Sequence, residues 1–180
     1  DTLAPSATIT LSNSDLTIGA TSTVTISFSE AVNGFSNSDV TVENGTLSTL
    51  TTSDSVTWTA TFTPTTGMSD ATNVVSLSTS YTDNVGNTGA AATSANYVVD
   101  TLAPSATITL SNSDLTIGAT STVTISFSEA VNGFSNSDVT VENGTLSTLT
   151  TSDSVTWTAT FTPTTGMSDA TNVVSLSTSY

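Results

Sequence analysis

Residues 56–63 read VTWTATFT, an unbroken alternation of apolar and hydroxyl side chains. Residues 24–29, VTISFS, alternate in the same way. Successive side chains of a β-strand point to opposite faces, so a period of two is typical of strands with one face in a core and the other in water. The two stretches therefore predict a β-sheet protein, with Trp58 and Phe62 in its core.

Further strands are expected where short apolar runs lie between turn signals. No window has the period of an amphipathic helix, and Asn-Gly pairs and other Asn-rich or Gly-rich segments separate the runs. About seven short strands in about 100 residues indicate an immunoglobulin-like β-sandwich. The additional strands are predicted at Ala7–Leu11, Leu16–Ile18, Val40–Val42, Leu47–Leu50, Val74–Tyr81 and Ala95–Val99.

The chain repeats itself without drift, because residues 1–81 recur as residues 100–180. A fixed period is typical of repeat arrays, and this period has the size of one small domain. We expect two tandem sandwiches, residues 1–99 and 100–180. The second has no counterpart of residues 82–99 and therefore lacks its last strand. The sequence has the form of a window cut from a longer array, in which neighbouring identical repeats are the first partners.

Charge and composition exclude several classes of function. The chain has 15 Asp and Glu residues and no Lys, Arg or His, which gives a net charge of −15. Nucleic acids and anionic lipid surfaces are not expected as partners, because phosphate binding depends on Lys and Arg. The absence of Cys excludes disulfides and thiolate sites. No apolar run approaches the roughly 18 residues of a membrane span, so direct membrane insertion is not expected.

Five segments, taken in order and at this spacing, resemble the bacterial Ig-like repeats of giant secreted adhesins and biofilm-associated surface proteins. They are residues 27–35 (SFSEAVNGF), 39–46 (DVTVENGT), 58–64 (WTATFTP), 83–87 (DNVGN) and 100–104 (DTLAP). The resemblance covers the whole chain. It implies an extracellular cell-surface stalk, secretion in unfolded form, and calcium bound near the joints between domains.

The acidic residues have a metal-binding interpretation of their own. In a sandwich of this topology, the loops after strands B and F lie at the end where the chain enters the domain. The expected ligands there are Asp1, Glu30 and Asp83, completed by Asn84 and Asn87. Calcium takes 6 to 8 oxygen ligands at about 2.3–2.6 Å, and a mixed oxygen shell suits it. The alternative is a turn held by Asp and Asn side chains, since residues 83–87 do not match an EF-hand.

A second calcium site is expected at the joint between the repeats. Its candidate ligands are Asp100, Glu129, Asp15 and Asp70. The acids Asp39, Glu43 and Asp54 are interpreted instead as solvated loop residues. Asn44-Gly45-Thr46 matches a glycosylation acceptor, but Asn-Gly also favours a type I′ hairpin turn, which we prefer.

The residue inventory argues against an enzyme. Without His, Cys, Lys or Arg, the usual nucleophile–base arrangements cannot form. Glu30 and Asp83 could still act as a glycosidase pair across a sugar, at about 5–9.5 Å from each other. The same pair around calcium is the interpretation we prefer.

These observations predict a structural extender of a bacterial surface adhesin or fibre, with calcium stiffening the rod. One alternative is an extracellular filament subunit, because the second repeat leaves an open strand edge to which another copy could add a strand and form a homopolymer. Another is a glycan-binding Ig-like module. The Thr-rich strand faces resemble ice-binding surfaces, but Thr is also a common choice for the wet face of a strand.

Overall fold

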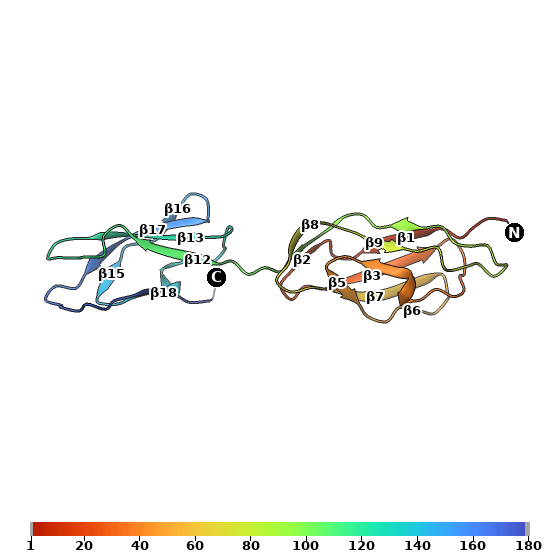
Figure 1. The fold of residues 1–180 in the computed structure, drawn as a ribbon, viewed down its shortest axis with the longest axis horizontal. Helices are drawn as coiled ribbons and strands as arrows, with labels where there is room; N and C mark the ends of the chain where they lie inside the picture. Colours follow the sequence, from red (N-terminus) through yellow and green to blue (C-terminus); the bar gives the residue numbers. More distant parts are fainter. Residues whose placement is uncertain (1, 179–180) are drawn as a thin grey trace. The chain divides into compact units, whose positions relative to one another are not determined.

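The structure is a computed structural model that describes residues 2–178, and it divides the chain into two units, Asp1–Ala103 and Pro104–Tyr180. Unit 1 is built from strands β1 to β11 and one 3₁₀ turn, Asn37–Asp39 (Figure 1). The strands are β1 (Ala7–Leu11), β2 (Asp15–Thr17), β3 (Ser22–Phe28), β4 (Val40–Val42), β5 (Gly45–Leu47), β6 (Thr51–Thr52), β7 (Thr57–Pro64), β8 (Ser69–Asn73), β9 (Val75–Leu77), β10 (Ala92–Thr93) and β11 (Tyr97–Asp100).

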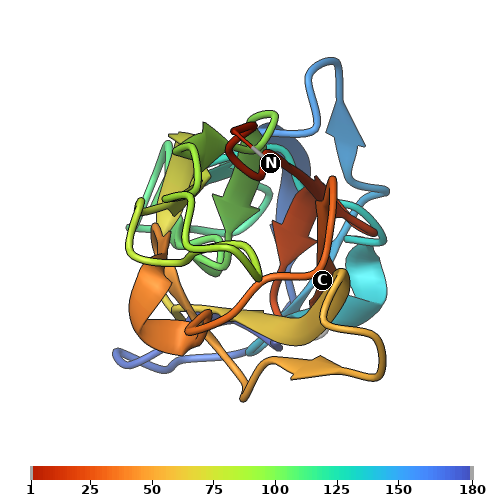
Figure 2. The same cartoon turned by 90° about the vertical axis from the view of Figure 1, so that its right-hand side faces the viewer.

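The strands of unit 1 form the two layers of an immunoglobulin-like sandwich (Figure 2). One layer has the order β1-β3-β7-β5, with β6 also paired to β7. The other consists of β10-β9-β4 and β2-β11-β8. In immunoglobulin terms the first layer is A-B-E-D, and in the second β8 and β9 form strand F while β10 and β11 form strand G. The predicted all-β sandwich is confirmed.

The alternating stretches pair with each other at the centre of the first layer. In the β3–β7 ladder, Val24 lies opposite Ala60 and Ile26 opposite Trp58. Val24, Ile26 and Phe62 are fully buried, whereas Trp58 is only partly buried against the core. The period of two in the sequence thus produces the buried face that it predicts.

The predicted strand boundaries fail mainly in the second half of the unit. Residues 47–50 do not form one strand, since β5 ends at Leu47 and β6 begins at Thr51. The strand predicted over residues 74–81 is confined to β9, and β8 was not predicted at all. Strand β8 has the sequence SDATN, with no apolar alternation, and it is extended because it pairs with β11. Tertiary pairing decides such strands, not local pattern.

The predicted type I′ hairpin at Asn44-Gly45 is wrong. A type I′ turn needs positive φ at both central residues, but only Asn44 has one, at 50°. The flanking strands β4 and β5 also belong to different layers, so the segment is a crossover. Gly45 is required for space, because a Cβ there would collide with the Phe62 ring.

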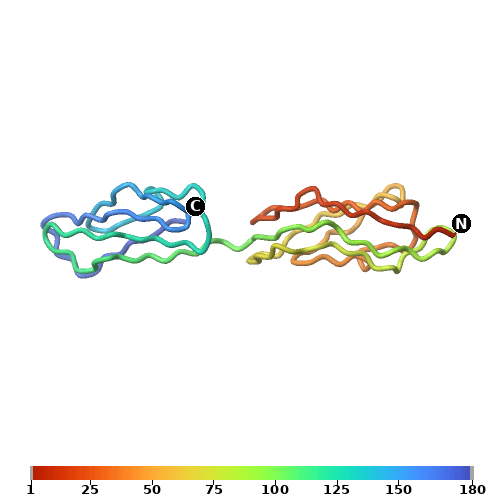
Figure 3. The backbone as a smooth tube through the Cα atoms, turned by 90° about the horizontal axis from the view of Figure 1, so that it is seen from above, coloured from red at the N-terminus to blue at the C-terminus, as the bar shows by residue number. Residues whose placement is uncertain are grey.

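Unit 2 repeats the first layer of unit 1 with the order β12-β13-β17-β15 and β16 paired to β17. Its second layer is reduced to the pair β14-β18. Figure 3 traces the path of the backbone within each unit. Its elements are β12 (Ala106–Leu110), β13 (Ser121–Phe127), the 3₁₀ turn Asn136–Asp138, β14 (Val139–Val141), β15 (Gly144–Leu146), β16 (Thr150–Thr151), β17 (Thr156–Pro163) and β18 (Val174–Leu176).

Among the described residues of unit 2, the segments identical in sequence to β2 and β8 form no strand. In unit 1 both of these strands pair with β11, one on each side. The strand predicted at the end of the second repeat, residues 173–180, is observed only at Val174–Leu176. Its last two residues lie outside the described part of the chain. Where no counterpart of β11 is present, the described segments equivalent to its two neighbours form no strand.

Candidate functional site

The loop between β9 and β10 carries the predicted ligands Asp83, Asn84 and Asn87. Asp83 is only 2% exposed. Its Oδ1 accepts the backbone N–H groups of Val85 (2.9 Å) and Asn87 (2.8 Å), and its Oδ2 accepts the side-chain amide of Asn87 (2.7 Å). The backbone N–H of Asp83 in turn donates to the carbonyl oxygen of Asn87 at 3.1 Å. The Asp83 carboxylate thus holds the loop together by accepting hydrogen bonds from Val85 and Asn87.

These hydrogen bonds decide the protonation of Asp83. Burial of the carboxylate acts to raise its pKa, but the hydrogen bonds from the Asn87 side chain and from the loop N–H groups outweigh burial and leave the pKa below its usual value. The group is therefore ionised at neutral pH. A glycosidase acid needs the opposite shift, so Asp83 is suited to a structural or ligand role and not to proton donation.

Three segments distant in sequence meet around this loop, as predicted. Asn33, from the loop after β3, donates its side-chain amide to the Asn84 Oδ1 (2.8 Å) and to the Asp83 carbonyl oxygen (3.4 Å). The backbone of Asn33 also forms an isolated β-bridge with Thr82. Asn87 donates to the carbonyl oxygen of Leu3, in the segment that leads into β1 (3.4 Å). Side-chain amides of Asn33 and Asn87 therefore donate the hydrogen bonds that connect the three segments. Asn33 was not among the predicted site residues.

An aromatic cluster supports the same end of unit 1. The ring of Tyr81, directly before the loop, is fully buried and lies edge-on to Phe28, with centroids 4.9 Å apart. The Tyr81 hydroxyl donates to the carbonyl oxygen of Ala90, across the loop. Gly89 approaches the Tyr81 ring so closely that a Cβ there would collide with it. The loop is therefore fixed at both of its ends.

Glu30 lies just after β3 and is half-buried, and no described residue donates a hydrogen bond to its carboxylate. Asp1, the third predicted acid, lies outside the described residues. Within residues 2–178, no three acidic side chains gather closely enough to hold a metal ion. Carboxylates of the described residues alone thus do not complete the predicted calcium shell.

The remaining oxygen atoms fit calcium in part. An ionised carboxylate has about four acceptor positions, and Asp83 uses three of them for hydrogen bonds within the loop. Asn84 offers an amide oxygen at the same junction, and the surrounding carbonyl oxygens are ligands of the kind that calcium accepts. Any ion here would need Glu30 or backbone oxygens in addition to the Asp83 loop.

The acids predicted for the second calcium site have separate local roles in unit 1. Asp15, exposed at the start of β2, donates its backbone N–H to the Asn13 Oδ1 (3.1 Å). The Asp70 Oδ2 accepts the side-chain amide of Asn44 at 2.9 Å. Asp100 is the half-buried last residue of β11, paired with β2 and β8. In unit 2, Glu129 is half-buried, like its counterpart Glu30.

The expectation that Asp39 is a solvated loop acid is wrong. Asp39 is 5% exposed and closes a capping box with Ser36 at the 3₁₀ turn, where its Oδ2 accepts the Ser36 N–H (2.8 Å). Its Oδ1 accepts the hydroxyls of Ser78 and Ser80. Burial acts to raise the pKa of Asp39, and the serine hydrogen bonds outweigh it, so the pKa is lowered. The spacing Ser36-x-x-Asp39 was the available signal.

The other two acids are exposed, as expected. The Asp54 Oδ1 accepts the N–H groups of Val56 (2.9 Å) and Thr57 (2.8 Å), which lowers the pKa of Asp54. The Glu43 Oε2 accepts the N–H of Val74 at 2.7 Å. Both side chains therefore organise local backbone in addition to meeting solvent.

The chain is similar to one known family of domains along its whole length. A family model described as "Bacterial Ig-like domain" matches residues 1–99 and again residues 100–180. No curated protein matches the chain. Domains of this family commonly occur in surface proteins and are typically non-enzymatic. No helix within residues 2–178 is long and apolar enough to cross a membrane. The chain belongs to the bacterial Ig-like domain family and carries two of its domains in tandem.

Proposed function

We propose that the chain is an extender segment of an extracellular bacterial adhesin or fibre, in which tandem Ig-like domains project a distal binding region for adhesion or biofilm formation. The observation that carries the proposal is the perfect repetition of a domain that has a core of its own. The buried residues of unit 1 form one cluster and those of unit 2 another. Such units add length, since each folds around its own core.

The proposal also includes a non-catalytic role. The chain has none of the cationic or thiol side chains on which most active sites depend. Its most organised acid, Asp83, is held ionised by the loop that it closes. A spacer needs such fixed loops because they transmit force and orientation between folded ends.

Calcium is the proposed stiffening ion. The net charge of −15 has no internal compensation, so divalent cations in the extracellular medium are the natural counter-ions. The junction of Asn33, Asn84, Asn87 and Asp83 with the segment before β1 is the place where oxygen atoms from three segments meet. An ion bound there would tie the leading segment of a domain to its sandwich.

The test is thermal unfolding of the chain in calcium and in chelator, followed with scattering under both conditions. A ligand that binds only the folded state raises its apparent stability. We expect calcium to raise the melting temperature of unit 1 by binding at the Asp83 junction. A narrower distribution of interdomain distances in calcium is expected from the separate predicted site with Asp100 and Glu129 at the joint. Magnesium at equal concentration is the control for simple screening of charge.

Glu30→Gln is the sharper variant for this test. Asp83→Asn would disturb the loop with or without an ion, because Asp83 accepts three hydrogen bonds there. No described residue donates to the Glu30 carboxylate, so its neutral variant should leave the apo stability nearly unchanged and weaken the calcium effect. Equal calcium and magnesium effects, or a calcium effect that Glu30→Gln leaves intact, would remove calcium from this end of unit 1 while the spacer role could stand.

A further inference from the structure

Each unit contains two Asn-Gly pairs, and the structure holds them in opposite surroundings. In unit 1 the first pair, Asn33-Gly34, lies in the loop after β3, and the second, Asn44-Gly45, lies where β4 passes into β5. The backbone nitrogen of glycine can attack the side-chain carbonyl carbon of a preceding asparagine, because glycine has no side chain that obstructs the approach. Asparagine is a labile residue in proteins, and local structure decides which pair reacts.

The first pair is free to move. Asn33 and Gly34 are both exposed. Gly34 has a φ of 78°, and apart from its chain neighbours no atom lies within 4 Å of the place that a Cβ would occupy. The Asn33 side chain donates one hydrogen bond to the exposed Asn84 (2.8 Å) and a long one to the Asp83 carbonyl oxygen (3.4 Å). Water competes for such bonds, so the side chain can turn toward the Gly34 nitrogen.

The second pair is held by the sandwich. The side-chain amide of Asn44 donates to the Asp70 Oδ2 (2.9 Å) and to the Asn73 Oδ1 (2.7 Å), and Asn73 is only 1% exposed. Gly45 belongs to β5 and lies so close to the Phe62 ring that a Cβ there would collide with it. Neither the side chain nor the backbone of this pair can rearrange without local opening of the domain.

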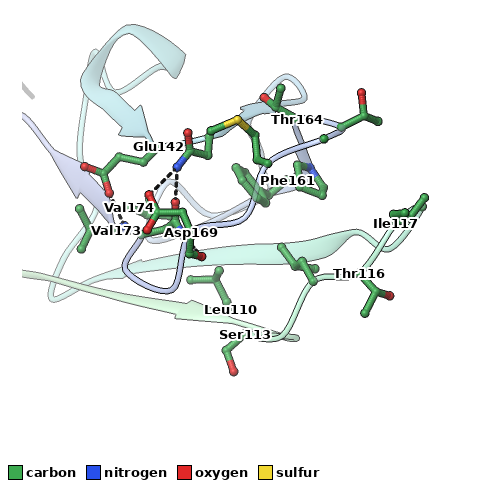
Figure 4. Close-up of a pocket in the computed structure, with 18 residues that line it drawn as sticks. Leu110, Ser113, Thr116, Ile117, Glu142, Phe161, Thr164, Asp169, Val173 and Val174 are labelled. Atoms are coloured by element: carbon green, nitrogen blue, oxygen red, sulfur yellow. Dashed lines mark hydrogen bonds between the residues drawn. The ribbon is translucent and has the colours of Figure 1, made fainter.

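Unit 2 holds its own second pair, Asn143-Gly144, in the same way. The Asn143 amide donates to Asp169 (3.0 Å) and to Asn172 (2.7 Å), and Figure 4 draws these hydrogen bonds as dashed lines. A Cβ on Gly144 would collide with the Phe161 ring. The first pair of unit 2, Asn132-Gly133, is exposed like its counterpart in unit 1. The contrast between an open and a closed pair is therefore present within each unit.

We propose that Asn33-Gly34 is a site of spontaneous deamidation and that the fold protects Asn44-Gly45 from the same reaction. The Gly34 nitrogen forms a bond to the Asn33 Cγ and loses its proton, and the side-chain nitrogen leaves as ammonia. Water then opens the cyclic imide at one of its two carbonyl carbons, which yields aspartate or isoaspartate. Water is the only co-reactant. The inference does not depend on calcium or on the proposed spacer role.

The reaction changes the junction between Asn33 and the Asp83 loop. An amide donates hydrogen bonds, whereas a carboxylate only accepts them, so the bond to the Asp83 carbonyl oxygen is lost and a negative charge takes its place. The backbone of Asn33 also donates to the Thr82 carbonyl oxygen (2.7 Å) and accepts the Thr82 N–H (3.1 Å). Isoaspartate adds a methylene to the main chain between these two groups, so the two bonds are not kept together. Deamidation therefore loosens the loop that Asp83 closes.

The test incubates the folded full chain at mildly alkaline pH and follows both pairs by mass spectrometry. Asn132→Ser, at an exposed position, silences the open pair of unit 2 and gives its peptide a different mass. A glutamate-specific protease then releases Asn33 within residues 31–43 and Asn44 within residues 44–129. Free peptides of residues 31–38 and 42–49 give the rate of each pair without the fold. A sample digested before incubation corrects for deamidation during digestion.

We expect Asn33 to react within about tenfold of its free peptide and Asn44 at least about 100-fold more slowly than its own, because Asn44 reacts only from locally opened states. Asn84→Ala removes an exposed acceptor of the Asn33 amide. It should raise the rate at Asn33 toward that of the free peptide and leave Asn44 unchanged. Thr88→Ala, at an exposed position of the same loop, is the matched control and should change neither rate.

The converted chain carries one more negative charge and is separated from the unconverted chain by ion exchange. It should melt at a lower temperature in unit 1, as read from Trp58 fluorescence with Trp157→Phe also present. Equal protection of Asn33 and Asn44, or a rate at Asn33 that Asn84→Ala leaves unchanged, would overturn the proposal. Equal melting of converted and unconverted chains would contradict the loosening of the Asp83 loop.

Discussion

Residues 104–180 of unit 2 are identical in sequence to residues 5–81 of unit 1, but equivalent residues are buried to different extents in the two units. Leu16 in unit 1 is 1% exposed, whereas the identical Leu115 in unit 2 is only half-buried. In unit 1, β11 pairs with β2 on one side and with β8 on the other. Unit 2 contains no counterpart of residues 82–99, and among its described residues the segments identical to β2 and β8 form no strand. The comparison teaches that β2 and β8 form strands through their pairing with β11 and not through their own sequences.

The largest expected effect comes from removing the anchor of that strand. Tyr97→Ala should lower the free energy of unfolding of unit 1 by about 3–5 kcal/mol, the usual cost of deleting a buried aromatic ring. Unit 1 is measured by Trp58 fluorescence in a Trp157→Phe background. Tyr97→Phe is the control, since it keeps the ring and loses only the hydroxyl contacts to Glu43, worth about 1 kcal/mol. Equal losses in the two variants would contradict the anchoring role of the ring.

The next largest effect is expected at alkaline pH, which should lower the stability of unit 1 more than that of unit 2. Burial raises the pKa of Tyr97 to about 12, with the negative charges of Glu43 and Asp70 acting in the same direction. A raised pKa means that stability is complete below pH 10, the unfolded value, and is lost as pH rises toward 12, by on the order of 2 kcal/mol. Chemical denaturation between pH 9 and 12 measures this loss of stability, with Trp58 reporting on unit 1 in the Trp157→Phe chain and Trp157 on unit 2 in the Trp58→Phe chain. A Tyr97→Phe chain that loses as much would assign the effect to Tyr81 or to general charge repulsion.

A single polar residue sharpens the comparison further. Asn73 is buried and links Asp70, Asn44 and Tyr97, whereas the identical Asn172 is exposed. We expect Asn73→Ala to destabilise unit 1 by about 2 kcal/mol, since it leaves buried partners unsatisfied. Asn172→Ala should cost unit 2 less than about 0.5 kcal/mol, as surface changes do. Urea unfolding gives both values, with Trp58 reporting on unit 1 in the Trp157→Phe chain and Trp157 on unit 2 in the Trp58→Phe chain; equal costs would mean that Asn172 is as buried in solution as Asn73.

The smallest effect is expected at Thr101. Its hydroxyl donates to the Thr65 carbonyl oxygen at 2.6 Å, and it is 5% exposed. Thr101→Val should lower the stability of unit 1 by about 1 kcal/mol through the lost hydrogen bonds. Thr2→Val, at the equivalent position of the first repeat and exposed, is the matched control and should be neutral. If Thr101→Val leaves the stability of unit 1 unchanged, the stabilising contacts of this segment end with β11 and do not extend to Thr101.

The sequence predicts those parts of the fold where side-chain pattern and burial agree. The alternation around Val24 and Phe62 defines β3 and β7 because one face of β3 is buried along its whole length and one face of β7 is buried from Ala60 onward. Strand β8 could not be predicted, since its extended form comes from pairing with β11 and not from apolar side chains. The same reason explains why an identical sequence in unit 2 forms no strand.

The candidate site was predicted in its location more than in its chemistry. Strand order placed the loop of Asp83 near the segment before β1, and their hydrogen bonds confirm that convergence. The central role of amides, above all of Asn33, was missed because Asn is frequent in turns for local reasons. Burial of Asp39 was missed for a similar reason, because only its partner serines reveal that it is satisfied inside the protein. The calcium ligands remain a prediction.

The most direct measurement of the central claim adds to unit 2 the segment that completes the sandwich of unit 1. The sequence of residues 82–103 is added after residue 180 in the Trp58→Phe chain, and the free energy of unfolding of unit 2 is compared with that of unit 1 in the Trp157→Phe chain. If the segment of residues 82–99, with β10 and β11, accounts for the difference between the units, their stabilities should agree within about 0.5 kcal/mol. A unit 2 that stays less stable than unit 1 by the original margin would contradict the account.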